Sequence, residues 1–459
     1  MLIQRGVCLR YIRESVSTGT IVEKFLAVFK LGLKYLYRYR RRYYFLLAAL
    51  VFGFTIVTFI TSQKDGMYNN VYYSAQSHYA GDIVAMGYDF DTTVWDYSHR
   101  LGQGEIAAIM KAADLSGINP RYTVFRTHCG DALVHYNGAA IQLKNLVGCD
   151  WEGESFLFDK MYFDAPHMPF TGDDSIVLSV PIAVQLGVQM GDNVILEVET
   201  RSGQKNTGMF IVKGIVQDTS IFGYYKAYIS RLTLNRLVTY NDDDCSSVGF
   251  FLDDPATAEY KRLRFQEFLS GFTQTGPLAY DRDALDLEKE MPWEGIMVFL
   301  YTLPVYLSEI SYLLDAMNII TYFLYVMMLL IIMVSALVTY RLILRERSRE
   351  MGVMRVIGFY GRDLRIVLWT EIIVLGFISL IAGFLLALIL NWAASFLSFS
   401  WFPGFGIFLK GGRLKAMYLP GTMLINVGLL LLVLFTLTLI PSLRVSMKNL
   451  PGLLSGETL

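Results

Sequence analysis

Several motifs that identify common enzymes are missing from this sequence of 459 residues. It contains no G-x-x-x-x-G-K-[ST] phosphate loop, so no ATPase of that type lies within the chain. The G-x-S-x-G and H-E-x-x-H patterns of serine hydrolases and zinc proteases are also missing, and neither C-x-x-C nor H-x-x-x-H spacing occurs. We therefore expect no catalytic residue, no cofactor site and no metal site here, and a protein that is not an enzyme.

Cysteine and histidine are scarce. Three of the four cysteines lie between residues 63 and 312, which allows one disulfide, such as Cys129–Cys149, and leaves one thiol over. The alternative, which we favour, is that they are small buried apolar residues. All five histidines lie in the same region, and His128 and His135 fall on strands expected to be neighbours. We expect satisfied surface histidines there rather than metal ligands.

Charged residues are also few. They make up 18% of the chain against 54% hydrophobic residues, a balance too apolar for an ordinary soluble protein of this length. The net charge of −1 conceals a segregation, because residues 1–42 carry ten Lys and Arg against two acids while residues 63–312 carry 18 against 33. The composition predicts a membrane protein with a large acidic region outside the membrane.

Four stretches are long and apolar enough to cross a hydrocarbon core of about 30 Å, which takes roughly 20 residues of helix. The first follows the run YRYRRR and is not followed by a small-residue cleavage site, so we interpret it as an uncleaved span. The predicted spans are residues 43–62, 313–340, 366–390 and 418–441.

Basic residues predict the orientation of these spans. Runs of Arg and Lys at Arg38–Arg42, Arg341–Arg365 and Arg444–Lys448 lie at alternate ends of the spans, and such runs favour the cytoplasm. Both termini should therefore be cytoplasmic. The segments expected on that side are 1–42, 341–365 and 442–459, and those expected outside are 63–312 and a short loop at 391–417.

The region outside is long enough for its own core, and its patterns predict an α+β domain with two lobes. The sequence favours a helix near 103–116, strands at 121–128, 131–137 and 139–147, a helix-turn-strand unit from Ser175 to Thr200, strands in GMFIVKGIVQD and KAYIS, and a helix at 255–270. The apolar run 296–307 is too short to span and contains Pro304, so we expect it to pack at the membrane surface or to form a stalk. Residues 24–38 predict an amphipathic interfacial helix. The fold class is thus a multi-pass α-helical membrane protein with four transmembrane helices and a large α+β extracytoplasmic domain between helices 1 and 2.

The segment RERSREMGVMRVIGFYGRDLR, residues 345–365, lies between two spans. On a helical wheel, its apolar and basic residues separate. Met351, Val353, Met354 and Ile357 fall on one arc, and Arg345, Arg349 and Arg355 on the other. A basic amphipathic helix is typical of an anchor on anionic lipid. The interleaved Glu346 and Glu350 instead favour a protein dock, because paired charges set register between proteins and give nothing to a lipid anchor.

Two acids lie in or beside the predicted spans. Asp315 is near the outer end of the second span, and Glu371 lies about two turns into the third. Intramembrane carboxylates are costly and point to function by default. The alternative is structural for both, since Asp315 can reach the interface and Glu371 can pair with Arg362 or Arg365.

At this point the chain resembles a known family. The run RERSREMGVMRVIGFYGRDLRIVLWTE is similar to the R-x-R-E-[IM]-G-x-x-[RK]-[AV]-x-G segment of the FtsX, MacB and LolC/LolE permeases, the type VII ABC transporters. The matching residues are Arg349, Glu350, Gly352, Arg355 and Gly358, with Glu371 opening the third span; Val356-Ile357 departs from the commoner Ala-Leu. The runs IVLSVPIAVQLGVQMGDNVILEV and LVGCDWEGES resemble parts of the family's external core, and IPSLRVSMKNLPGLL resembles its closing tail.

The resemblance implies a mechanism. The permease portion of such proteins contains no ATPase. They dimerise, as homodimers or paralogous heterodimers, and the short cytoplasmic helix after the second span binds a separate or fused ABC ATPase, which holds ATP and Mg²⁺. Motion of the ATPase passes along the spans to a MacB-like core domain outside, here residues 63–312. The residues implied in ATPase coupling are Arg345, Glu346, Arg349, Glu350, Gly352, Met354, Arg355 and Gly358.

Three functions remain open within this resemblance, all in the cytoplasmic (inner) membrane with the large domain in the periplasm. The first is extraction of lipoproteins from the outer leaflet, as in the LolC/LolE branch, which we favour because the external region is too large for the cell-division FtsX branch. The second is export of a peptide or other amphiphile. The third is control of an external hydrolase. An intramembrane hydrolase using Glu371 and Asp315 is the least favoured alternative, and beyond membrane lipid we expect no nucleic-acid partner.

Overall fold

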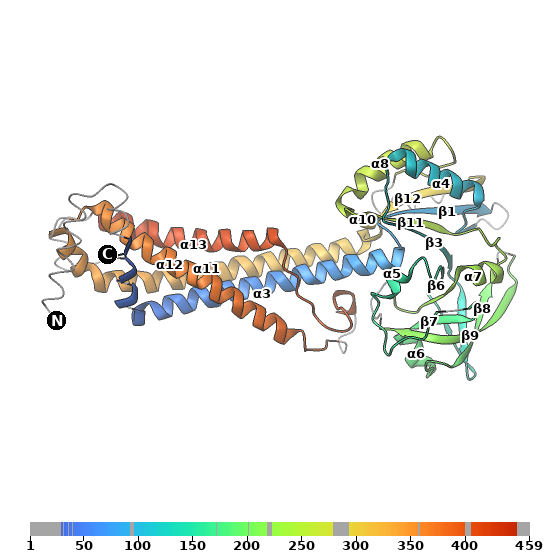
Figure 1. Cartoon of the computed structure of the whole chain (residues 1–459), viewed down its shortest axis with the longest axis horizontal. Coiled ribbons are helices and arrows are strands. Elements are labelled where there is room, and N and C mark those ends of the chain that lie inside the picture. The colour runs from blue at the N-terminus through green and yellow to red at the C-terminus, as the bar shows by residue number, and fades with distance from the viewer. Residues whose placement is uncertain are drawn as a thin grey trace. The chain divides into compact units, whose positions relative to one another are not determined.

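The computed structural model (Figure 1) describes residues 29–30, 32–34, 36–38, 40–91, 96–170, 172–200, 202–217, 223–278, 293–356, 359–399 and 405–447. The chain divides into two compact units. The helical unit comprises Met1–Gly66, Met317–Phe396 and Ala416–Leu459; the sheet unit comprises Met67–Ala316 and Leu397–Lys415.

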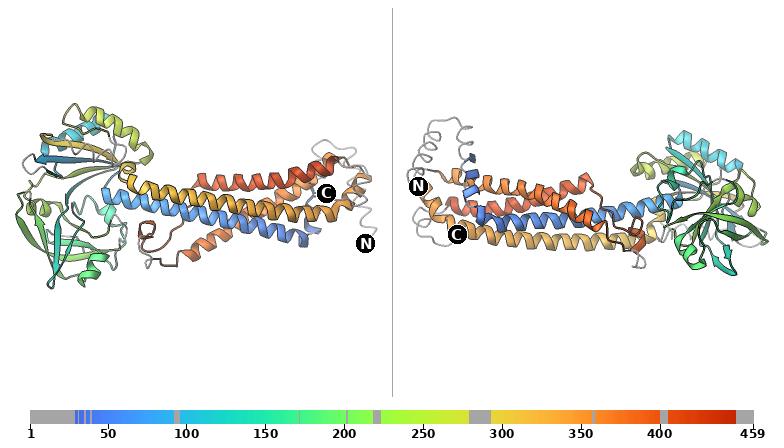
Figure 2. Two further views of the ribbon diagram at one scale, coloured as in Figure 1. Left: turned by 180° about the vertical axis from the view of Figure 1, so that it is seen from behind. Right: turned by 60° about the horizontal axis from the view of Figure 1, so that its bottom comes forward.

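Among the described residues, four long helices are apolar enough to cross a membrane by length and composition, as the sequence predicts. They are α3 (Arg40–Tyr79), α11 (Ser308–Val356), α12 (Gly361–Ala394) and α13 (Pro420–Met447). Within the helical unit they lie side by side in both views of Figure 2. Among residues 24–38, those that the structure describes are helical at 29–30, 32–34 and 36–38.

Helices α3 and α11 are longer than the spans predicted at 43–62 and 313–340. Helix α11 runs for 49 residues without a break and therefore includes the first part of the segment predicted at 341–365. The physical reason is that Arg and Glu are good helix formers, and a change from apolar to charged residues does not end a helix.

Close packing of the helical unit depends on small residues, as is common where helices meet in a membrane. A Cβ atom at Gly383 of α12 would stand 3.0 Å from the Val51 carbonyl oxygen of α3, and the Thr55 hydroxyl donates to the Gly383 carbonyl at 3.1 Å. A polar layer adds to this contact, because Asn391 of α12 accepts from Gln63 at 2.8 Å and donates to Ser62 at 2.8 Å.

The sheet unit is built on one continuous path of strands in the order β12-β1-β11-β3-β6-β10-β7-β9-β8-β4-β5, with β2 paired to β1. The β6–β10 and β7–β9 pairs are parallel, and the other pairs are antiparallel. The strands are β1 (Ile83–Asp91), β2 (Asp96–Ser98), β3 (Tyr122–Cys129), β4 (Ala132–Tyr136), β5 (Ala139–Gln142), β6 (Asn145–Cys149), β7 (Ser175–Ser179), β8 (Asn193–Glu199), β9 (Lys205–Val216), β10 (Lys226–Ser230), β11 (Ser247–Phe251) and β12 (Gly295–Thr302).

Two hydrophobic cores divide this unit into lobes. In the first, α4 (Gln103–Ser116) and α8 (Ala258–Leu269) pack on strands β1, β11 and β12. In the second, α6 (Val180–Leu186) and α7 (Arg231–Leu237) pack on strands of the β4–β10 group. Short helices α5 (Ser155–Phe158) and α10 (Leu303–Tyr306) complete the set named in Figure 1. The expected α+β character and the helix at 103–116 are confirmed.

Three expectations for this region are corrected. The run 296–307 does not pack at a membrane surface, because most of it is β12, paired with β1 along eight residues. The stretch 139–147 forms two strands rather than one. The strands of His128 and His135 are not neighbours, since β3 pairs with β6 and β11 while β4 pairs with β5 and β8.

The described cysteines are free thiols, so the alternative disulfide Cys129–Cys149 is not formed. Cys149 is buried and its sulfur donates to the Ile229 carbonyl at 3.3 Å. Burial, and then the neighbouring Glu154, raises the pKa of the Cys149 thiol well above its ordinary value, which keeps it in the unreactive thiol form. This agrees with the favoured interpretation of small buried residues.

Candidate functional site

A buried ion pair links three helices of the helical unit. Arg347 of α11 donates to both carboxylate oxygens of Glu371 of α12, at 2.7 and 3.0 Å. The Tyr43 hydroxyl of α3 donates to Glu371 at 2.6 Å, and Arg347 donates to that hydroxyl at 2.6 Å. The exposed fractions are 2% for Tyr43, 1% for Arg347 and 0% for Glu371, so this triad is shut off from solvent.

The surroundings of the triad are apolar, which makes the pairing obligatory. Leu46, Tyr340, Leu344, Met351, Leu368 and Ile372 belong to the same buried cluster. In such surroundings an unpaired charge is strongly disfavoured, whereas the fork of a guanidinium on a carboxylate satisfies both groups in one fixed geometry. The triad therefore fixes the rotation of α11 relative to α3 and α12.

The partner of Glu371 was wrongly expected to be Arg362 or Arg365. Arg347 was overlooked, although its spacing offered a signal: it lies three residues after Leu344 and four before Met351, on the stripe that faces the core. An arginine on an apolar stripe needs an acid on a neighbouring helix, and Glu371 is the acid that the described part of the chain places there.

The opposite side of α11 carries an exposed stripe of mixed character. Leu342 (58% exposed), Val353 (47%) and Val356 (61%) are apolar, and Arg345 and Glu346 lie exposed between them. Leu342, Glu346, Val353 and Val356 follow one another at spacings of four, seven and three residues, and Arg345 lies three residues after Leu342. All five therefore lie along one face of the helix. We call these five residues the exposed stripe.

The other residues predicted for coupling do not share this face. Gly352 and Met354 are buried, and Glu350 and Arg355 are half-buried; of Arg349 the structure describes the backbone alone, and Gly358 and Ile357 lie outside the described residues. The predicted apolar arc is therefore wrong for Val353. Val353 is two residues from Met351, about 200° around the helix, so the two cannot face the same neighbour.

Asp315 has none of the features of Glu371. It is exposed on α11, and no described Lys or Arg forms an ion pair with it. The structural alternative, in which Asp315 simply meets solvent, fits this position.

A second buried charge cluster holds the end of α3 within the sheet unit. Arg126 of β3 donates to the carbonyls of Ser77 and His78, at 3.0 and 2.9 Å, and forms an ion pair with Glu154 at 2.5 Å. Lys226 of β10 contacts the His78 ring at 2.9 Å and carbonyl at 3.3 Å. Two buried cations thus meet the carbonyl end of a long helix, where the helix dipole favours positive charge.

Two further contacts complete the joint at the end of α3. Tyr79 stacks on Tyr306, beside the start of α11, with ring centroids 3.8 Å apart and an interplanar angle of 8°. Nearby, His128 lies beside the two cations, and burial, then Lys226 and Arg126, lowers its pKa well below the ordinary value. His128 is therefore neutral at neutral pH and adds no third positive charge. The sequence analysis named His128 only as a surface histidine, and it assigned no role to the other residues of this joint.

No metal site was expected, and the described residues contain no group of three or more His, Cys, Asp or Glu side chains placed to hold an ion. Ion pairs and hydrogen bonds within the protein join the members of each buried cluster, so the arrangement holds elements of the fold together.

Comparison with known proteins gives one family match. A family model described as FtsX-like permease C-terminal matches residues 322–450, which include most of α11 and all of α12 and α13. Two solved structures are similar at low identity. The periplasmic region of MacB from Actinobacillus actinomycetemcomitans has 13% identity, covers 51% of this chain and 95% of that chain, and gives a TM-score of 0.30. A domain of a putative permease protein from Porphyromonas gingivalis has 10% identity, covers 49% of this chain and 89% of that chain, and gives 0.26.

No curated protein matches the chain. The likeness to this family rests on the sequence match alone. Arg347, Glu371 and the exposed stripe lie within the matched range, and Tyr43 contacts the two triad residues there. Residues 322–450 of this chain therefore match the C-terminal part of an FtsX-like permease, and the part of the chain that the structure describes holds four helices able to span a membrane.

Proposed function

We propose that the chain is the membrane subunit of an ABC-type machine whose ATPase is a separate chain holding ATP and Mg²⁺. The ATPase would dock on the exposed stripe of α11, on the cytoplasmic side of an inner membrane with both termini on that side. Two such membrane subunits, identical or paralogous, would form the dimer. The family match to residues 322–450 supports this kind of partner.

The observation that carries the proposal is the placement of the triad directly behind the exposed stripe. Arg347 lies one residue from Glu346, yet its side chain is buried and reaches Tyr43 and Glu371 on two other helices. A force applied to the stripe would therefore act on α3 and α12 as well as on α11. Helices α3 and α11 continue into the sheet unit, which would receive the motion outside.

For the cargo we propose lipoproteins, extracted from the outer leaflet of the inner membrane. The large external region and the separate ATPase favour this function. Export of a peptide or other amphiphile is the second candidate, and control of an external hydrolase the third. Purification of the complex followed by mass spectrometry separates them: bound lipidated protein supports the first, an unlipidated peptide the second, and a cell-wall hydrolase without cargo the third.

Charge reversal on the exposed stripe tests the docking. Glu346→Lys is expected to leave the protein inserted and folded but to reduce co-purification of the ATPase about tenfold, because like charges across an interface are strongly unfavourable. Glu350 is unsuitable for this test, because it is half-buried and does not lie on the stripe. Gly352 is unsuitable for this test, since it is buried and a large side chain there would disturb the packing of α11.

The matched control is Asp315→Lys, which reverses an exposed acid on the same helix but outside the stripe. It should retain the ATPase at the wild-type level. Equal retention of the ATPase by Glu346→Lys and wild type, with full ATP-dependent activity, would contradict docking at this surface.

A further inference from the structure

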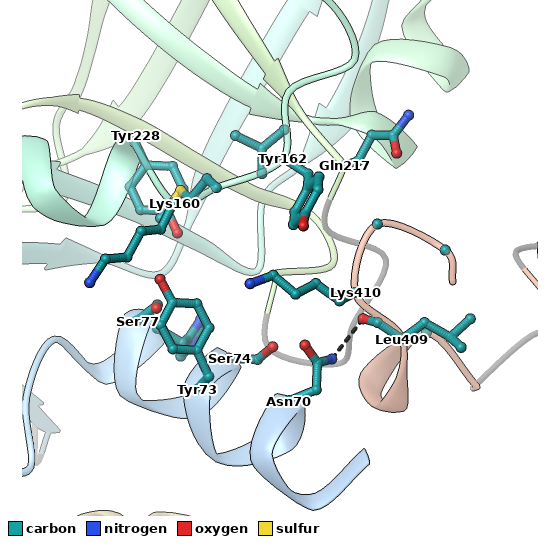
Figure 3. A pocket seen from close by; sticks show the side chains of 16 residues that line it. Asn70, Tyr73, Ser74, Ser77, Lys160, Tyr162, Gln217, Tyr228, Leu409 and Lys410 are labelled. Atoms are coloured by element: carbon teal, nitrogen blue, oxygen red, sulfur yellow. Dashed lines mark hydrogen bonds between the residues drawn. The ribbon is translucent and has the colours of Figure 1, made fainter. Parts of the chain in front are cut away.

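A small polar pocket in the sheet unit has no role in the proposed coupling to an ATPase. It lies between the outer part of α3, the segment after α5, and the loop that joins α12 to α13 (Figure 3), and its cavity volume is about 80 Å³. None of the 16 residues that line it is acidic, although residues 63–312 carry 33 acids against 18 basic residues. Two lysines, Lys160 and Lys410, line it from different segments.

The sequence builds one wall of the pocket as a tight hairpin turn. In the run K-G-G-R, the Lys410 amide donates to the Arg413 carbonyl at 2.9 Å, and the two central glycines have φ of +59° and +72°. Positive φ at both central positions is the requirement of a type I′ turn, which Gly-Gly meets without strain. Gly411 also lies against Tyr162, where an added Cβ would stand 3.2 Å from the ring.

Hydrogen bonds from α3 fix this loop in place. The Asn70 side-chain amide donates to the Leu409 carbonyl at 2.7 Å (Figure 3) and to the Ile407 carbonyl at 3.2 Å. Lys410 follows directly, and its ammonium lies 5.3 Å from the ring centroid of Tyr73 and 5.5 Å from that of Tyr162. The lysine is therefore held over the cavity by two aromatic faces rather than left free in solvent.

The charge in the pocket is not balanced within the part of the chain that the structure describes. No described carboxylate forms an ion pair with Lys160 or Lys410. Burial, then the nearby Lys415 and Lys160, lowers the pKa of Lys410, as expected for a cation that faces other cations. An anion between Lys160 and Lys410 would relieve this repulsion.

We propose that this pocket binds a phosphate group, held by Lys160 and Lys410 and by the hydroxyl donors around them. The cavity suits one small anion, because its volume of about 80 Å³ exceeds the roughly 10–15 Å³ that a single water needs. Ser74 and Ser77 supply hydroxyl groups at the wall. The loop that carries Lys410 joins two helices able to span a membrane, so the phosphate has two sources: a phospholipid headgroup at the membrane surface, or free phosphate.

The test uses the full chain purified in detergent. In one arm, native mass spectrometry follows retention of added phosphatidylglycerol; in the other, isothermal titration follows inorganic phosphate. Lys160→Ala and Lys410→Ala are each expected to weaken binding on the order of tenfold, the usual loss of a charge-assisted hydrogen bond. Binding in the first arm alone identifies the lipid headgroup, and in the second arm free phosphate.

Lys415→Ala is the matched control, because Lys415 lies on the same loop and is exposed but does not line the pocket. It should weaken binding clearly less than either pocket variant, because Lys415 acts only through its charge near Lys410, and Lys410→Arg should retain most of the wild-type affinity. Equal weakening by Lys415→Ala would show unspecific attraction and overturn the proposal, as would binding in neither arm by a wild-type protein that melts cooperatively. A melting midpoint for each alanine variant within error of wild type shows that lost binding is not lost folding.

Discussion

Replacing Arg347 by methionine is expected to destabilise the helical unit by about 3–5 kcal/mol, the range seen when one partner of a buried ion pair is removed. The variant leaves Glu371 charged and without its guanidinium in surroundings that exclude water. Glu371→Leu should have a similar effect, because it leaves Arg347 buried without an acid. Thermal unfolding in detergent, followed by loss of the monodisperse species, measures both.

The double variant separates charge burial from packing. Arg347→Met with Glu371→Leu replaces the pair by apolar side chains, a change that is often neutral in other proteins. We expect it to be more stable than either single variant. Arg345→Met is the matched control, since Arg345 is two residues away and exposed, and it should change the midpoint little. Additive losses in the double variant would mean that the two side chains are not coupled.

The same double variant tests the function of the triad. It should insert and bind the ATPase through the intact exposed stripe, yet lose much of the ATP-driven activity, because α3 and α12 would no longer be held to α11 by a fixed geometry. Wild-type activity in the stable double variant would assign the triad to stability alone.

Replacing Arg126 by methionine is expected to destabilise the sheet unit by a similar amount, about 3–5 kcal/mol. Glu154 would lose its partner, and the carbonyls of Ser77 and His78 would lose their donor. Hydrogen exchange measured by mass spectrometry should show faster exchange in the last turns of α3, while exchange in the helical unit stays unchanged. Arg126→Lys should rescue the variant in part, because a lysine keeps the charge but cannot form the guanidinium fork.

The control for this variant is Arg236→Met. Arg236 pairs with Asp173 and Asp242, but it is 57% exposed, and exposed pairs contribute about 1 kcal/mol or less. Its substitution should leave both the midpoint and the exchange pattern close to wild type. Unchanged exchange at the end of α3 in Arg126→Met would contradict the role of Arg126 in the joint.

The parts of the fold that depend on local pattern were predictable from the sequence. Span number follows from the length of apolar runs, and the helix at 103–116 and the strand KAYIS follow from periodicity. Strand β12 was missed because a short apolar run fits either a strand or a membrane-surface segment. Its partner β1 begins at residue 83, about 200 positions earlier, so no local signal identified the pairing.

The candidate site was predictable in part, for the same reason. The exposed stripe contains Arg345 and Glu346, which the sequence placed in the coupling segment. The triad depends on which face α11 turns toward α3 and α12, and tertiary packing decides that face. The sequence therefore favoured Arg362 and Arg365, which are closer to Glu371 along the chain than Arg347. The K-G-G-R turn has a local signal, two consecutive glycines. It was overlooked because residues 391–417 were interpreted only as a short external loop.

Helix α3 is tied to its neighbours in each unit, around Glu371 to Arg347 of α11 in the helical unit, and through the Tyr79 ring to the Tyr306 ring of α10 in the sheet unit. Helices that share a bidentate ion pair resist sliding, because a displacement of one along the other must break that pair. We therefore expect a displacement of α11 within the helical unit to carry α3 and α12 with it, so that the three helices respond as one lever rather than one at a time.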